Sequence, residues 1–142
     1  MIVLLIREIM TRGVVTASPD TRLAEGRRLL DEHRIRHLPV VVDGRLAGIV
    51  SDRDLRSAGA SGRPTAVGEI MTPDPITVGP DTRVEVAARL MLDRRLGGLP
   101  VVDDGELIGI VTSDDLLRAL LGVIETATLE RISVELAGPR DA

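Results

Sequence analysis

Residues 8–57 read EIMTRGVVTASPDTRLAEGRRLLDEHRIRHLPVVVDGRLAGIVSDRDLRS. Residues 69–118 read EIMTPDPITVGPDTRVEVAARLMLDRRLGGLPVVDDGELIGIVTSDDLLR. The two stretches align without a gap at an offset of 61 residues, and they share the blocks EIMT, PDTR, LPVV, DG, GIV and DL. Such similarity within one chain indicates that a single supersecondary unit has been duplicated. We expect the two units to bury their open faces against each other in one pseudo-symmetric body.

Each unit predicts a mixed α/β fold with the order β-α-β-β-α. Asp43-Gly44 lies between two runs rich in Val and Ile, which is a strong signal for a tight β-hairpin. In the second copy, Thr82 and Glu85 predict a capping box at the start of a helix. The elements expected in the first copy are a strand over 14–16, a helix that opens at 19–21, strands over 38–42 and 46–50, and a helix from Ser51.

This order of motifs resembles the cystathionine β-synthase (CBS) domain, and two units in tandem resemble a CBS pair, or Bateman module. The resemblance rests on EIMT, a strand that ends in Thr, HLPVV-DG-LAGIV and S-x-x-D, and it covers about residues 7–120. We expect a first CBS domain over 1–61, a second over 62–122, and a tail over 123–142. The resemblance implies a regulatory protein that binds AMP, ADP, ATP, S-adenosylmethionine or an NAD-type dinucleotide in clefts between the domains. No cofactor is expected to be required.

One motif matches the Gly-x-x-Ser/Thr-x-x-Asp pattern with which the family binds ribose and phosphate. Its hydroxyl residue lies where strand becomes helix, beside free N–H groups that suit a phosphate. Its carboxylate, one turn later, can accept bonds from both hydroxyls of a ribose, and its glycine is expected to leave room for the ligand. The alternative is that Ser-x-x-Asp simply caps the helix. The motif occurs at Gly48, Ser51 and Asp54, and again at Gly109, Thr112 and Asp115.

The adenine would be held by aliphatic side chains, because the chain has no aromatic residue. An apolar slot with backbone hydrogen bonds to the edge of the base would be sufficient to bind the adenine. The alternative is that the same residues belong to the hydrophobic core. The positions equivalent to those of the family are Val15, Thr16, Ala17, Leu38 and Pro39 in the first repeat, and Ile76, Thr77, Val78, Leu99 and Pro100 in the second.

The two copies differ where a phosphate would lie. The first copy has Arg36, His37 and Arg53, whereas the counterparts at an offset of 61 are Gly97, Gly98 and Asp114. We therefore expect one better anion site, built mostly from the first repeat, and a weaker or differently selective second one. His33 lies four residues from His37, as in a helical metal pair, but His37 falls in the approach to a strand, so we expect no metal site.

The composition excludes several other functions. The 142 residues carry a net charge of −4 and include no cysteine, no aromatic residue and no lysine. Disulfides, thiolate chemistry and lysine-based catalysis are therefore excluded, and nucleic-acid binding is disfavoured. The apolar start, residues 1–6, is too short to cross a membrane and lacks the features of a signal peptide. We expect a cytoplasmic protein that is not an enzyme, with no nucleic-acid or membrane partner.

The tail lies outside the repeat. Residues 116–124 are expected to extend the last helix, and residues 130–136 alternate polar and apolar side chains, which predicts a strand. This strand and the following turn resemble the start of an ACT domain, as in bacterial CBS–ACT proteins. The alternative is an edge strand that pairs across a dimer. Apolar residues such as Leu117, Leu120 and Leu121 fit a homodimer interface.

Three functional hypotheses follow. The leading one is a sensor of an adenosine-containing ligand that closes a cleft between the repeats and passes the signal to a partner or an appended domain. The second is a purely structural dimerisation module whose clefts do not bind. An enzyme ranks third, because no nucleophile, metal set or Gly-rich phosphate loop accompanies the carboxylates and His37.

Overall fold

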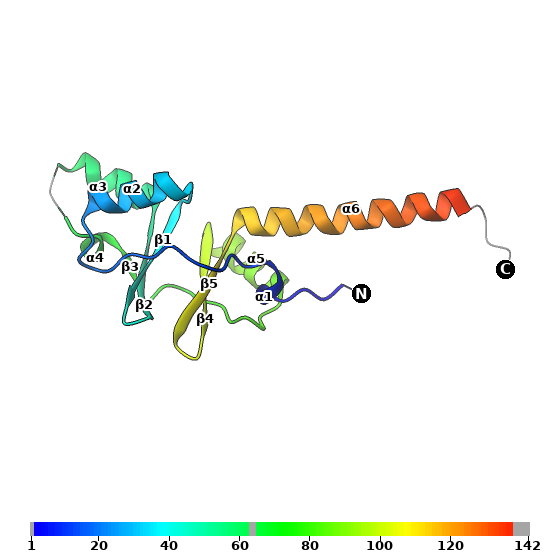
Figure 1. The fold of residues 1–142 in the computed structure, drawn as a ribbon, viewed down its shortest axis with the longest axis horizontal. Helices are drawn as coiled ribbons and strands as arrows, with labels where there is room; N and C mark the ends of the chain where they lie inside the picture. Colours follow the sequence, from blue (N-terminus) through cyan, green and yellow to red (C-terminus); the bar gives the residue numbers. More distant parts are fainter. Residues whose placement is uncertain (1, 63–64, 138–142) are drawn as a thin grey trace.

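The structure, a computed structural model, describes residues 2–62 and 65–137. It is built from two α/β halves that meet along a shared sheet, and one long helix projects away from them (Figure 1). The elements are α1 (Ile6–Ile9), α2 (Leu23–His33), β1 (His37–Val42), β2 (Arg45–Ser51), α3 (Asp52–Ala60), α4 (Val67–Ile70), β3 (Thr72–Pro73), α5 (Val84–Arg94), β4 (Gly98–Asp103), β5 (Glu106–Thr112) and α6 (Ser113–Ala137).

The two predicted hairpins are confirmed. β1 pairs antiparallel with β2, and β4 pairs antiparallel with β5. Asp43 and Gly44 turn the first hairpin with φ values of 50° and 79°, the left-handed region that a two-residue hairpin turn requires. The hairpins join where Arg45 pairs with Glu106, which gives the strand order β1-β2-β5-β4.

The strand predicted over 14–16, and its counterpart over 75–77 in the second repeat, are each reduced to a single bridge one residue later. Ala17 bridges Val40, and Val78 bridges Val101, both in parallel. A further rung toward residue 15 would need an N–H group on residue 39, and Pro39 has none. Pro100 blocks the second copy in the same way. The prolines of the two LPVV motifs therefore prevent both strands from extending beyond a single bridge.

The two repeats exchange their EIMT segments. Ile6 and Met10, from the first repeat, lie in the core of the second half. Val67, from the start of the second repeat, lies in the core of the first half. The exchange is fastened by backbone hydrogen bonds, because Ile6 N donates to Thr82 O at 2.8 Å and Val67 N donates to Thr21 O at 2.7 Å. Each half is therefore completed by a segment of the other repeat. We call these two segments, residues 4–11 and 65–72, the straps.

The straps also account for the helix start that was predicted wrongly. Thr82 and Glu85 do not form a capping box, because helix α5 begins after Arg83 without a side-chain cap. Thr82 Oγ1 instead accepts a hydrogen bond from Gly79 N at 3.0 Å. The N–H of Val84 donates to Leu4 O at 2.9 Å, so the incoming chain supplies the acceptor that a capping side chain would have given.

The space beside the motif glycines is filled by the straps and not by a ligand, which corrects the expectation above. A Cβ placed on Gly48 would lie 2.5 Å from Met71 Sδ and 2.8 Å from Thr72 O. A Cβ on Gly109 would lie 2.9 Å from both Met10 Sδ and Thr11 O. Both glycines thus allow a second backbone to run close beside the strand.

The strand predicted over residues 130–136 is wrong, because helix α6 continues through Ala137. An isolated strand at this place has no neighbour to pair with, whereas a helix satisfies its own backbone groups. The edge-strand hypothesis depended on that strand and is therefore wrong for residues 130–136. The resemblance of the tail to the start of an ACT domain stays a prediction, and its turn, residues 138–142, lies outside the described residues. Within the described part of the chain, no helix combines the length and apolar character needed to cross a membrane.

Candidate functional site

A cleft of about 260 Å³ lies between the two repeats. This volume is close to the lower end of the range for small-molecule sites. Residues 13–15 and 33–37 of the first repeat form one side, together with Thr11 of the strap. The second repeat contributes Gly97, Ile110, residues 112–115 and Arg118. The cleft therefore exists only where the two repeats meet.

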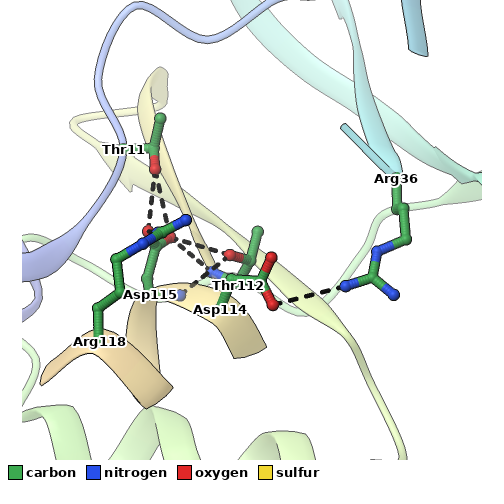
Figure 2. A network of polar contacts seen from close by, with 6 residues as sticks. All are labelled: Thr11, Arg36, Thr112, Asp114, Asp115 and Arg118. Carbon is green, nitrogen blue, oxygen red and sulfur yellow. Dashed lines mark hydrogen bonds and ion pairs between the residues drawn. The ribbon is translucent and has the colours of Figure 1, made fainter. Parts of the chain in front are cut away.

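Asp115 is the polar centre of this cleft. Its side chain is buried, with 5% exposed, although it sits at the first turn of an exposed helix. Its carboxylate accepts hydrogen bonds from Thr112 N at 2.9 Å, from Thr112 Oγ1 at 3.1 Å and from Thr11 Oγ1 at 3.1 Å (Figure 2). Asp115 N donates to Thr112 Oγ1 at 3.3 Å, so the predicted capping by the Thr-x-x-Asp motif is confirmed.

The equivalent motif in the first repeat folds in the same way. Asp54 N donates to Ser51 Oγ at 3.1 Å, and Ser51 N donates to Asp54 Oδ2 at 2.9 Å, which is a complete capping box at the start of α3. Ser51, Arg53 and Asp54 do not line the cleft described above. At the offset of 61 residues, Ile76 and Thr77 are the counterparts of Val15 and Thr16, and neither of them lines this cleft.

Two ion pairs lie at the cleft, one between the repeats and one within α6. The Arg36 guanidinium of the first repeat lies 3.5 Å from Asp114 Oδ1 of the second, and the Arg118 guanidinium lies 3.2 Å from Asp115 Oδ1 (Figure 2). Arg34 also lines the cleft. The lining thus holds three guanidinium groups and two carboxylates, a net charge of +1 with both histidines neutral.

His37 explains why the second repeat has glycines where the first has Arg36 and His37. A Cβ on Gly97 would lie 2.9 Å from the His37 ring, and a Cβ on Gly98 would lie 3.2 Å from it. The imidazole therefore lies against the backbone of its own counterpart, and a second histidine could not fit there. Burial, with the nearby Arg36 charge, lowers the pKa of His37, while Asp54 opposes the shift.

The predicted site residues divide into three groups. Val15, Arg36, His37, Thr112 and Asp115 line the cleft together. The six predicted adenine-binding residues that are almost fully buried belong to the interior, which is the alternative stated above; they are Ala17, Leu38, Pro39, Val78, Leu99 and Pro100. Those that neither line this cleft nor are fully buried are Thr16, Ser51, Arg53, Asp54, Ile76 and Thr77.

Several residues that line the cleft were not predicted from the sequence. Thr11 belongs to the EIMT block, which was used only to detect the repeat, and its approach to Asp115 depends on the exchanged strap. Asp114 was named in the sequence only as the counterpart of Arg53. The reversal of charge between Arg53 and Asp114 was the signal that could have drawn attention to Asp114 as a site residue.

Comparison with known proteins gives the family. The model of the CBS domain matches residues 6–61 and again residues 67–122. The chain belongs to the CBS domain family. A CBS domain-containing protein of Dictyostelium discoideum is 39% identical over 136 residues, which cover 85% of this chain and 94% of that protein.

Other CBS relatives are enzymes that share only this region. The inosine-5′-monophosphate dehydrogenase of Korarchaeum cryptofilum is 45% identical over 106 residues, 74% of this chain. The match spans only 22% of that enzyme. The resemblance to the enzyme is therefore confined to a portion that corresponds to this CBS pair.

Solved CBS pairs superpose closely on this chain. The CBS domain pair of protein MJ0100, in complex with 5′-methylthioadenosine and S-adenosyl-L-methionine, has a TM-score of 0.81 at 35% identity and covers 85% of this chain and 98% of its own. CBSX2 in complex with AMP has a TM-score of 0.75 at 36% identity, with 84% and 97% covered. A putative acetoin utilization protein of Vibrio cholerae has a TM-score of 0.85 at 30% identity, with 90% and 99% covered.

Proposed function

We propose that this CBS pair is a regulatory protein that binds an adenosine-containing ligand in the cleft between its repeats. The observation that carries the proposal is the buried Asp115 carboxylate, which faces the same cavity as Val15, Thr112, Arg36 and His37. Complexes of similar CBS pairs with AMP and with S-adenosylmethionine support it.

Each part of an adenosine ligand has a chemically suitable neighbour. The Asp115 carboxylate can accept bonds from a ribose diol when the side chains of Thr11 and Arg118 turn aside, because each is joined to it only by side-chain contacts of 3.1–3.3 Å. Val15 offers an apolar face to the base. Arg36 and Thr112 lie where a 5′ phosphate or another polar group would emerge. Such a combination of modest contacts predicts binding in the micromolar range.

Regulation would follow from the position of the cleft. Because its walls come from both repeats, a ligand bound there contacts both halves and favours the arrangement in which they lie closer. A partner or an appended domain that distinguishes the two arrangements would then respond. We propose a non-catalytic role in the cytoplasm, with no nucleic-acid or membrane partner and no required cofactor, on the basis of the composition.

A homodimer is the second part of the proposal. Leu117, Leu120 and Leu121 on α6 are 53–57% exposed. Their counterparts at an offset of 61 are Arg56, Gly59 and Ala60, so only the second repeat carries this apolar helix face. We propose that two copies associate through it. A dimerisation module that binds no ligand remains the competing hypothesis.

The test is titration calorimetry with AMP, ADP, ATP, S-adenosylmethionine and NADH on three proteins. These are the wild type, Asp115→Asn and the matched Asp54→Asn. We expect the wild type to bind at least one ligand and Asp115→Asn to bind it at least tenfold more weakly. Asp54→Asn should retain this site. The absence of binding by the wild type at millimolar concentrations would refute the proposal and leave the dimerisation module.

A further inference from the structure

We propose that Asp114 sets the charge that the cleft accepts, so that the site takes an adenosine ligand with at most one phosphate and discriminates against a triphosphate. This inference rests on the proposed function, because it concerns the 5′ end of the same ligand. It depends on one carboxylate, its partner across the cleft and the charge of the remaining lining.

The position of Asp114 carries the argument. It directly precedes the buried Asp115, and its carboxylate lies across the mouth of the cleft from Arg36 at 3.5 Å (Figure 2). A ribose held at Asp115 would direct its 5′ substituent along this mouth, between the start of α6 and Arg36. Successive phosphates would therefore pass beside the Asp114 carboxylate.

Asp114 weakens the binding of phosphate groups in two ways. It occupies the guanidinium of Arg36, which is the cation best placed to meet a phosphate, and it adds a negative charge of its own. The Asp114 side chain is 54% exposed, so water and salt weaken the repulsion without removing it. At a separation of about 5 Å and an effective dielectric between surface and bulk values, one like charge changes affinity by about tenfold.

The charge of the lining matches a small anion better than a large one. The net charge of +1 balances about half to two-thirds of the charge of a monophosphate, which is about −1.5 to −2, whereas a triphosphate brings about two further negative charges into the same space. The corresponding position of the first repeat is Arg53, so the two copies of the motif differ here by two units of charge.

The experiment compares the affinities for AMP and ATP in the wild type, in Asp114→Asn and in Asp93→Asn. Asp93 is an exposed carboxylate at the end of α5, outside the cleft, and its substitution makes the same change of net charge. We expect the wild type to bind AMP at least tenfold more tightly than ATP. Asp114→Asn should reduce that ratio about tenfold, and Asp93→Asn should leave it unchanged.

Raising the salt concentration from 0.05 M to 0.5 M should also reduce the wild-type ratio, because screening acts on the same repulsion. If nucleotides bind but Asp114→Asn leaves the AMP-to-ATP ratio unchanged, this inference is wrong and the proposed function stands. The same holds if the wild type prefers ATP. If the wild type binds no adenosine nucleotide, both the proposed function and this inference fail.

Discussion

Replacing Gly48 with Ala tests the exchange of the EIMT straps directly. The added Cβ would lie 2.8 Å from Thr72 O, about 0.5 Å closer than an ordinary C–H···O contact. It would also lie 2.5 Å from Met71 Sδ, which can swing away, but Thr72 O belongs to the backbone that pairs with β2. Crowding of this kind costs about 1–3 kcal/mol.

Part of that cost is offset, because Ala is better than Gly inside a strand by about 0.5–1 kcal/mol. We therefore expect Gly48→Ala to lose about 1–2 kcal/mol of unfolding free energy, or about 3–7 °C in Tm. Urea and thermal unfolding followed by circular dichroism would measure the loss.

The control is Gly122→Ala, in the middle of α6, where an added Cβ meets nothing within 4 Å. It should gain about 0.5–1 kcal/mol from helix propensity alone. If Gly48→Ala proves as stable as the wild type, Met71 and Thr72 do not lie against β2, and the strap arrangement is refuted.

Three further predictions concern Ile6 in the core, His37 between the repeats, and the exposed apolar face of α6. Ile6→Ala, in the exchanged strap and fully buried, should cost about 2–5 kcal/mol in urea unfolding, whereas Ile2→Ala, 62% exposed, should change stability by less than about 0.5 kcal/mol; equal effects would contradict the packing of α1. Because the pKa of His37 is lowered in the folded state, the unfolded chain takes up a proton at this residue first as the pH falls. The contribution of neutral His37 to the free energy of unfolding is therefore full above pH 6.5 and is lost as the pH falls through the folded pKa. The free energy of unfolding of His37→Asn should fall less than that of the wild type between pH 7.5 and 5.5. Leu120→Glu should shift the proposed dimer toward monomer in analytical ultracentrifugation, and an unchanged mass would exclude this face as the interface.

The features visible in the sequence are those fixed by neighbouring residues. The Asp43-Gly44 turn and the Ser51 cap follow from a few adjacent side chains, and both formed as predicted. The strap exchange depends on contacts between segments far apart in the chain, because Val67 and Thr21 are separated by 46 residues and Ile6 and Thr82 by 76. The repeat pattern is the same whether each EIMT block packs on its own unit or on the other.

The candidate site was predictable to the same extent. The Thr112–Asp115 pair could be recognised from its spacing, because capping geometry depends only on local sequence. Thr11 could not, because it reaches Asp115 only through the exchanged strap. The residues 130–136 show the opposite failure, in which a local alternation suggested a strand that has no neighbour with which to pair.

The strap exchange also bears on how such a molecule could arise from one unit. A chain that ended at residue 62 would lack Val67, Ile70 and Met71, and its core would stay open on one side. Two copies of a single unit could close both cores only by trading their first segments, in a twofold-symmetric, domain-swapped pair. Joining the copies end to end makes that trade intramolecular and independent of concentration. Neither half can then unfold without exposing the hydrophobic core of the other, so we expect a single cooperative unfolding transition.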